Sequence, residues 1–370
     1  MTVNKRLKWF RQALRVLAAI VVVVLACFVL FPTGRYLLRA AWEEAKILAR
    51  RRSINVLVAD AATPAELRSK LVLVMAARDF ARDSVGLQTG ASFTTYSALG
   101  RDTLVLVVSA AYRDRLQSYT WWFPVVGRVP YKGYFDFDEA RRQEQALSAR
   151  GFDARLGAAS AFSTLGWFND PLLPSTLHAD TLTLANTVIH ELTHNTYYAP
   201  GGAIFNESFA NFVGARSAER FFRIRGQTAA ADEVGARWQD EKLLGRFWAS
   251  LYSRIDSTFK AHPGDDASHV AARIAVRDSI YTDAKQQLIH ELGPQLRTIS
   301  VRAVERVRLD NAILMSRRVY RTDLDAFDAV LTLNRGNLRR TVVQIIAAAK
   351  GNREHPFAAV RASGTAPVPR

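Results

Sequence analysis

The segment ANTVIHELTHNTYY, residues 185–198, contains two histidines four positions apart. Residues four apart lie one turn apart on nearly the same face of a helix, so His190 and His194 can both direct a ring nitrogen at one metal ion. Glu191 follows the first histidine and can reach the open side of that ion, where it would take a proton from a water molecule. The pattern predicts a catalytic metal centre, and the alternative is a surface helix that carries two histidines by chance.

The tetrapeptide IHEL occurs a second time, at residues 289–292, but without the second histidine. Gly293 and Pro294 follow at once, and this pair breaks a helix. We therefore expect His290 and Glu291 at the surface near a helix end. Only the first copy can hold a metal ion.

A third metal ligand is expected after a chain reversal, because catalytic zinc usually has three protein ligands and keeps one position for water. Residues 200–202 (PGG) turn the chain after His194, and FNESFANFVGARSAERFF, residues 205–222, reads as a helix packed back against the first. Glu207 lies in the first turn of this second helix and is the predicted third ligand, unless it serves only the helix dipole. Asn211, one turn further on, is a candidate to accept the far N–H of a ligand histidine.

Two sequence elements of this region resemble known metallopeptidases. HELTH followed by FNESFANFV resembles the gluzincins, in which the third ligand is a glutamate on the helix after the metal helix. NESFA is similar to the NExFA element of zinc aminopeptidases, although the twelve residues between His194 and Glu207 are fewer than in the large members. Most of the chain, including YTWWFPVVGRVPYKGYF (119–135) and AFSTLGWFNDPLLPS (161–175), resembles a family of bacterial membrane-associated predicted aminopeptidases.

The resemblance implies a membrane-associated zinc metallopeptidase, by family an aminopeptidase, with one Zn²⁺, a peptide substrate and Glu191 as the catalytic base. A zinc endopeptidase acting on envelope proteins and a non-catalytic zinc-binding scaffold remain alternatives. Hydrolysis also needs a hydrogen-bond donor for the oxyanion that forms at the scissile carbonyl. Three tyrosines are candidates for this role, with Tyr134 as the predicted catalytic one: Tyr131, Tyr134 and Tyr320.

The elements that must position these residues read as an α+β fold, with a zincin-like domain over residues 35–355 that contains a small sheet and a mainly helical C-terminal half. Helices are expected over residues 36–52 and 63–87, strands over 102–111, 119–127 and 152–162, and helices again over most of 180–350. Residues 356–370 are expected to form a disordered tail.

The N-terminus predicts a membrane anchor. Residues 1–15 contain five basic and no acidic residues, and residues 16–34 contain a long apolar run. These features are typical of a cytoplasmic basic segment followed by a single transmembrane signal-anchor. Lipidation at Cys27 or a buried core helix are alternative uses of the run. By family resemblance, the catalytic domain would lie in the periplasm, at the bacterial inner membrane.

The charge and cysteine content exclude other classes of function. The net charge is +16, but the arginines are scattered and form no basic block interleaved with aromatic residues, so we do not expect nucleic acid as a partner. One cysteine excludes an internal disulfide and a cysteine-based metal site. The polar residues of segment 185–198 also argue against an intramembrane metalloprotease.

Overall fold

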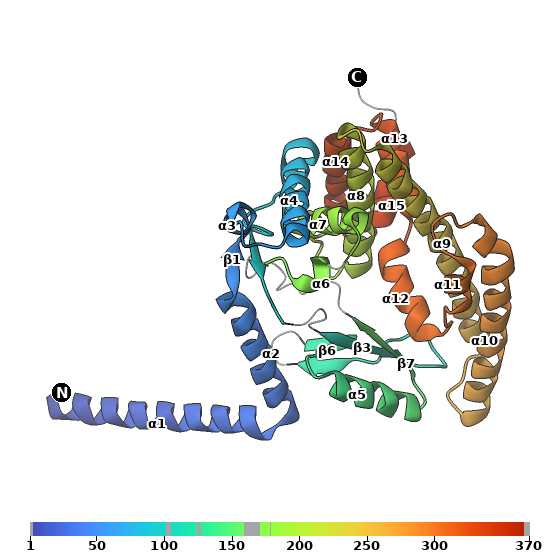
Figure 1. Cartoon of the computed structure of the whole chain (residues 1–370). Helices are drawn as coiled ribbons and strands as arrows, with labels where there is room; N and C mark the ends of the chain where they lie inside the picture. The colour runs from blue at the N-terminus through green and yellow to red at the C-terminus, as the bar shows by residue number, and fades with distance from the viewer. Residues whose placement is uncertain (1–2, 101–104, 124–126, 159–170, 178, 366–370) are drawn as a thin grey trace.

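The fold class is α+β, as predicted, with many helices and three small antiparallel sheets (Figure 1). The computed structural model describes residues 3–100, 105–123, 127–158, 171–177 and 179–365, apart from some side chains of the first helix. The predicted segment 161–175 lies largely outside the described residues.

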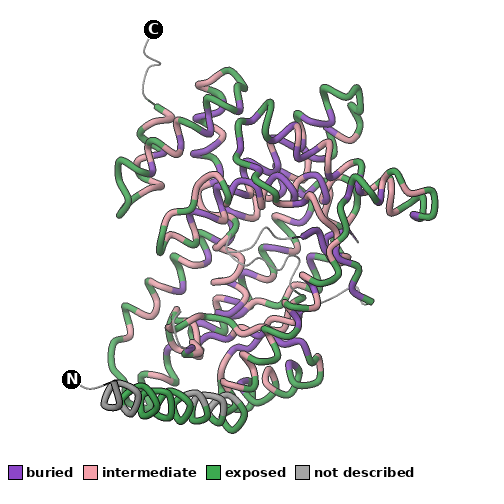
Figure 2. Tube along the Cα trace, turned by 90° about the vertical axis from the view of Figure 1, so that its left-hand side faces the viewer, coloured by how far each residue is buried: buried purple, intermediate pink, exposed green. Residues whose placement is uncertain are grey.

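The N-terminal residues form α1 (Val3–Leu30), which extends away from the rest of the molecule before α2 (Pro32–Ala49) begins (Figure 1). The described side chains of α1 are exposed along its length (Figure 2). No described helix is long and apolar enough to cross a membrane. The predicted transmembrane helix over residues 16–34 is therefore wrong, because the apolar run ends at Phe31, before Pro32, and is shorter than the ~20 apolar residues that a span requires.

The central sheet has the strand order β6–β3–β7, with both pairs antiparallel. Its members are β3 (Leu106–Ala111), β6 (Tyr131–Tyr134) and β7 (Asp153–Ala158). Two smaller two-stranded antiparallel sheets accompany it: β1 (Arg51–Ser53) pairs with β2 (Thr95–Ser97), and β4 (Trp121–Phe123) pairs with β5 (Gly127–Val129). The predicted strand 119–127 is thus replaced by parts of two shorter strands.

The two faces of the central sheet have different neighbours because side chains alternate along each strand. α5 (Phe137–Ala149) covers one face, where Val108 and Ala154 are buried with Leu147 of the helix. On the other face lies α12 (Asn311–Arg321), whose Ser316 accepts a hydrogen bond from Arg155 of β7. Figure 1 shows α5 and α12 on opposite sides of the sheet.

The remaining chain is mainly helical. In order, the elements are α3 (Ile54–Ala59), α4 (Ala65–Phe80) with a π-helical turn (Ala81–Val85), α6 (Pro174–Leu177), α7 (Thr181–Thr196), α8 (Ala203–Ile224), α9 (Thr228–Ala261), α10 (Ala267–Gln287) with a π-helical turn (Leu288–Leu292) and a 3₁₀ turn (Gly293–Gln295), α11 (Val301–Glu305), α13 (Leu324–Leu333), α14 (Leu338–Gly351) and α15 (Pro356–Thr365). The largest apolar core joins α4, α7 and α8 to α13, α14 and α15.

The C-terminal segment differs from its prediction as a disordered tail, because residues Pro356–Thr365 form the helix α15. Val360 is fully buried, and the Phe357 ring lies 5.2 Å from that of Phe205 in α8, between ring centroids. Burial of these two side chains supplies stabilisation that the composition of the segment does not reveal.

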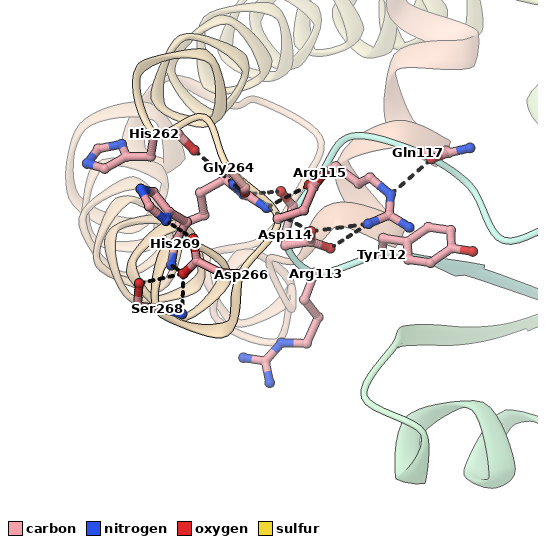
Figure 3. A network of polar contacts seen from close by, with 12 residues as sticks. Tyr112, Arg113, Asp114, Arg115, Gln117, His262, Gly264, Asp266, Ser268 and His269 are labelled. Atoms are coloured by element: carbon pink, nitrogen blue, oxygen red, sulfur yellow. Dashed lines mark hydrogen bonds and ion pairs between the residues drawn. The ribbon is translucent and has the colours of Figure 1, made fainter.

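Polar contacts tie the loop after β3 to the α9–α10 connection, as Figure 3 shows. Arg273 of α10 donates to the carbonyl oxygen of His262 at 2.8 Å and to the Asp114 carboxylate at 3.2 Å. Nearby, the buried Arg277 of α10 forms an ion pair with Asp153 of β7. These contacts connect the sheet to the helical half of the molecule.

Candidate metal centre

The helix α7 begins at a well-formed cap. Asp180 accepts hydrogen bonds from the backbone N–H groups of Leu182 and Thr183, both at 3.0 Å, which satisfies donors that the first turn leaves free. One face of α7 is buried in the main core through Leu184, Ala185, Val188, Ile189 and Leu192. The helix therefore has a fixed rotation, which holds the two predicted histidine ligands on its less buried side.

A tight reversal connects α7 to α8. The Asn206 side chain accepts a hydrogen bond from the N–H of Ala199 at 2.8 Å and donates one to the carbonyl of the same residue at 2.9 Å. Gly201 has φ +75°, a conformation that favours glycine. These features return the chain along α7 and place Glu207 opposite the histidines, in the second turn of α8 and not in the first turn as predicted, because the helix already begins at Ala203.

The close approach of the two helices requires a glycine in α8. A Cβ atom on Gly214 would lie 2.9 Å from the carbonyl oxygen of Asn186 and 3.2 Å from the Cβ of His190. Any side chain here would push α8 away from the helix that carries both histidines. Sequence reasoning missed this role, although a glycine inside a helical pattern is a recognised sign of close packing.

The three predicted ligands converge. The Nε2 atom of His190 lies 3.3 Å from Oε2 of Glu207, and the Nε2 atom of His194 lies 3.5 Å from Oε1 of the same carboxylate. One ligand atom from each residue can be chosen so that all lie within 4.8 Å of one another. A tetrahedral zinc ion with bonds of about 2.0–2.1 Å separates its ligand atoms by about 3.3–3.4 Å. The donor set and its spacing therefore fit a zinc ion.

The charges in this group also suit a metal ion. Burial alone would raise the pKa of Glu207, but hydrogen bonds with His190 and His194 lower it to about 2, so the carboxylate is ionised. Burial lowers the pKa of His194, while its hydrogen bond with Glu207 outweighs this and raises the pKa. The buried Nδ1 of His194 has no hydrogen-bond partner in the part of the chain that the structure describes. A bound cation would replace the protons that this carboxylate now stabilises.

Glu191 is half-buried beside the two histidines, but it does not belong to the group of converging ligand atoms. Its position one residue after His190 leaves its carboxylate free for a role other than ligation. This is the arrangement that the sequence predicts for a proton acceptor next to a metal ion.

The tyrosine Tyr320 lies closest to the ligands among those predicted for the oxyanion, with its ring centroid 6.5 Å from that of His190. Burial, together with the negative charges of Glu207 and Glu191, raises the pKa of Tyr320 to about 12, so its hydroxyl remains a hydrogen-bond donor. Ser208 and Asn211 of α8 fix the end of α12 through the carbonyl oxygens of Val319 and Tyr320. Asn211 uses its amide nitrogen for this bond of 3.0 Å to Tyr320, and no hydrogen bond joins it to a ligand histidine among the described residues.

The other two candidate tyrosines point in opposite directions from β6. Tyr131 lies on the α12 side, where burial and the charges of Tyr198 and Glu207 raise its pKa. Tyr134, three residues later, is 2 % exposed and packs in the α5 cluster, with its ring 6.5 Å from that of Tyr36. The structure does not bring Tyr134 to the metal centre, because side chains three apart on a strand lie on opposite faces.

The second IHEL copy lies far from this chemistry, as predicted. His290 is exposed, and its Nε2 atom lies 3.1 Å from the side-chain oxygen of Gln286 on the same helix. The helix changes to a π-helical turn at Leu288–Leu292 and ends in the 3₁₀ turn Gly293–Gln295.

Comparison with known families identifies the chain. A family described as "Putative aminopeptidase" matches residues 35–358, which is most of the sequence. Searches among curated proteins and among solved structures find no match. Membership of such a family supports a peptidase function and a peptide substrate. The match confirms, at the level of the family, the resemblance seen in the sequence: the chain belongs to this aminopeptidase family.

Proposed function

We propose that this protein is a zinc-dependent aminopeptidase with a single metal site formed by His190, His194 and Glu207. The observation that carries the proposal is the convergence of two imidazole nitrogens and one carboxylate within 4.8 Å, with Glu191 beside them and outside the ligand group. A purely structural zinc site would not need that additional carboxylate.

When bound, a zinc ion supplies Lewis acidity that lowers the pKa of a water molecule to about 7 and polarises the scissile carbonyl. In the proposed mechanism, the Glu191 carboxylate accepts the proton of the attacking water and delivers it to the leaving amine. The Tyr320 hydroxyl donates a hydrogen bond to the carbonyl oxygen as negative charge develops there. Asn211 is a positioning residue, since it holds the backbone carbonyl of Tyr320.

The variant Glu191→Gln tests this assignment. The amide keeps the size of the side chain but cannot take a proton, so we expect turnover to fall by roughly 10²–10⁴-fold while the zinc content stays at one ion per chain. His194→Ala should instead lose the metal. Both quantities can be measured on the same preparations, by peptide hydrolysis and by elemental analysis. Appreciable hydrolysis by Glu191→Gln would contradict the proposal.

Paired substrates test whether the enzyme trims N-termini or cuts internally. An aminopeptidase releases single residues from a peptide with a free amino terminus and leaves the acetylated peptide intact, whereas an endopeptidase cleaves both. Wild-type protein that binds zinc but cleaves neither peptide would favour the non-catalytic scaffold. The periplasmic location implied by the family resemblance stays a prediction, which a C-terminal reporter that works only outside the cytoplasm would test.

A further inference from the structure

A row of polar side chains crosses the face of the central sheet that is turned toward α12. Ser109 of β3 is directly opposite Tyr131 of β6 on one side and Arg155 of β7 on the other. Neighbouring strands lie about 4.8 Å apart, so the row places Arg155 roughly 10 Å from Tyr131 across the sheet. The charge of Glu207 contributes to the raised pKa of Tyr131, so this end of the row lies near the candidate metal centre.

The helix α12 connects this row of side chains with the candidate metal ligands. Ser316, Arg317 and Tyr320 share one face of this helix because they lie three and four positions apart. Ser316 accepts a hydrogen bond of 3.1 Å from Arg155, and the Tyr320 ring lies beside that of His190. Ser316 and Arg317 thus lie about one helical turn, ~5–6 Å along the axis, from Tyr320, and the charge of Arg155 acts on the Tyr320 hydroxyl.

The positive charge of these two arginines is not neutralised within the described part of the chain. Arg317 is half-buried and forms no hydrogen bond or ion pair with any described residue, and the only described partner of Arg155 is the neutral Ser316. Arg321, at the end of the same helix, is instead paired with Glu241 at 2.6 Å. Burial, followed by the charges of Arg321 and Arg155, lowers the pKa of Arg317, and the charge of the Glu241 carboxylate offsets only part of this effect. An anion bound here would relieve this repulsion.

We propose that Arg155 and Arg317 bind a carboxylate of the peptide substrate, on the leaving-group side of the scissile bond. This inference rests on the proposed peptidase function. Guanidinium groups bind carboxylates in a planar, often bidentate, geometry. Two positive charges repel a free α-amino group, so the amino terminus lies on the other side of the metal centre. An extended peptide advances about 3.3 Å per residue, so the carboxylate belongs to the first or second residue after the scissile bond.

The carboxylate has two possible sources: the C-terminus of a di- or tripeptide, or the side chain of Asp or Glu. Each source is tested with its own matched pair of peptides. The first pair has either a free or an amidated C-terminus, and the second pair has either Asp or Asn after the scissile bond. We expect the wild-type protein to prefer the charged member of at least one pair by roughly 10- to 100-fold in kcat/KM. If the preference occurs in just one of the two pairs, that pair identifies whether the C-terminal or the side-chain carboxylate binds.

The variants Arg317→Gln and Arg155→Gln should remove this preference, because each should raise KM for the charged peptide by a larger factor than KM for the neutral peptide. Arg340→Gln is the matched control, because Arg340 is exposed on α14 and its removal changes the net charge equally. Equal rates for both members of both pairs in the wild-type protein would overturn the proposal. So would an unchanged preference in both arginine variants.

A binding measurement separates this inference from the proposed function. Labelled peptides of the same pairs are titrated against the full chain carrying Glu191→Gln, with and without zinc, and fluorescence anisotropy reports the affinity. If the wild-type protein hydrolyses no peptide but Glu191→Gln binds the charged peptide tenfold more tightly through Arg317, the peptidase mechanism fails and the carboxylate site stands. If the wild-type protein hydrolyses both members of each pair equally well, the peptidase function stands and the carboxylate site fails.

Discussion

At the scale of single residues, four of the five members of the NESFA element have different tasks around the candidate metal centre. Asn206 closes the reversal onto Ala199, Glu207 faces the two histidines, and Ser208 holds the end of α12 through Val319. Phe209 packs in the main core. The ligand is thus flanked by residues that fix the turn before it and the helix beside it, which explains why such an element must be contiguous in the sequence.

The donor role of Tyr320 is tested by removing one oxygen atom. We expect Tyr320→Phe to lower kcat by roughly 10²-fold, since loss of one oxyanion donor typically has this effect, while KM and zinc content change little. The comparison variant is Tyr131→Phe, which removes the same atom from the sheet side of the centre. A large loss of kcat in Tyr131→Phe with a normal rate in Tyr320→Phe would transfer the role to Tyr131.

At the scale of elements, the ligand set was predictable because it follows from local rules. The spacing of His190 and His194 fixes them on one face of a helix, and a Pro-Gly-Gly turn forces the next helix back. The role of Tyr134 was not predictable in this way, since it depended on where β6 begins. A strand that begins at Tyr131 places Tyr134 under α5, and one residue of displacement would have reversed the two faces.

Other features depend on contacts between distant segments. The helix α15 exists because Phe357 packs on Phe205, about 150 residues earlier in the chain, and no local pattern reveals that contact. The same holds for the fit of Gly214 against Asn186 and for the hydrogen bond between Arg155 and Ser316. Sequence patterns thus predicted which residues could bind a metal and named some of their neighbours, such as Tyr320, but not the packing contacts that hold them in place.

The cap of α7 gives a prediction about stability. Asp180→Ala should lower the free energy of unfolding by about 1–2 kcal/mol and fray the first turn of the helix that carries both histidines. Asp180→Asn is the matched control, because an asparagine oxygen can still cap the helix. Thermal unfolding measured by circular dichroism would distinguish the two variants, and equal melting temperatures for Asp180→Ala and the wild type would contradict the prediction.

The same cap has a defined pH dependence. Partial burial would raise the pKa of Asp180, but hydrogen bonds from Thr183 and Arg237 lower it below its ordinary value. Because the folded-state pKa is lowered, the contribution of the ionised carboxylate is present above the unfolded pKa of about 3.9 and is lost as the pH falls through the folded value. The stability difference between Asp180→Asn and the wild type should therefore shrink below about pH 4.

At the scale of the whole molecule, the candidate metal ligands and the proposed carboxylate site lie on different units. His190, His194 and Glu207 belong to the large helical core, whereas Arg155 belongs to the central sheet, whose other face packs on α5. α12 contacts both units through Tyr320 and Ser316. Substrate binding across them therefore requires that the sheet keep a fixed position relative to the helices.

The buried cluster around Asp153 maintains that position. Arg277 of α10 pairs with the Asp153 carboxylate, which also accepts the backbone N–H of Asn311, the first residue of α12, at 3.0 Å. Arg277 further donates to the Asn311 side chain at 3.2 Å. β7, α10 and α12 thus meet at one group of charges that is shielded from water, where an uncompensated carboxylate is costly.

Arg277→Ala should therefore lower the free energy of unfolding by about 3 kcal/mol, because it removes the closest cation from the buried Asp153 carboxylate and leaves Arg113, whose Nε atom lies 3.8 Å away, as the remaining described cation. Arg254→Ala, which removes an exposed arginine from α9, is the control and should change it by less than about 0.5 kcal/mol. Urea unfolding gives both values. Adding Asp153→Asn to Arg277→Ala removes the buried carboxylate charge and should recover part of the loss. A loss that is equal in the single and double variants would show that packing, not charge, holds the sheet to the helices.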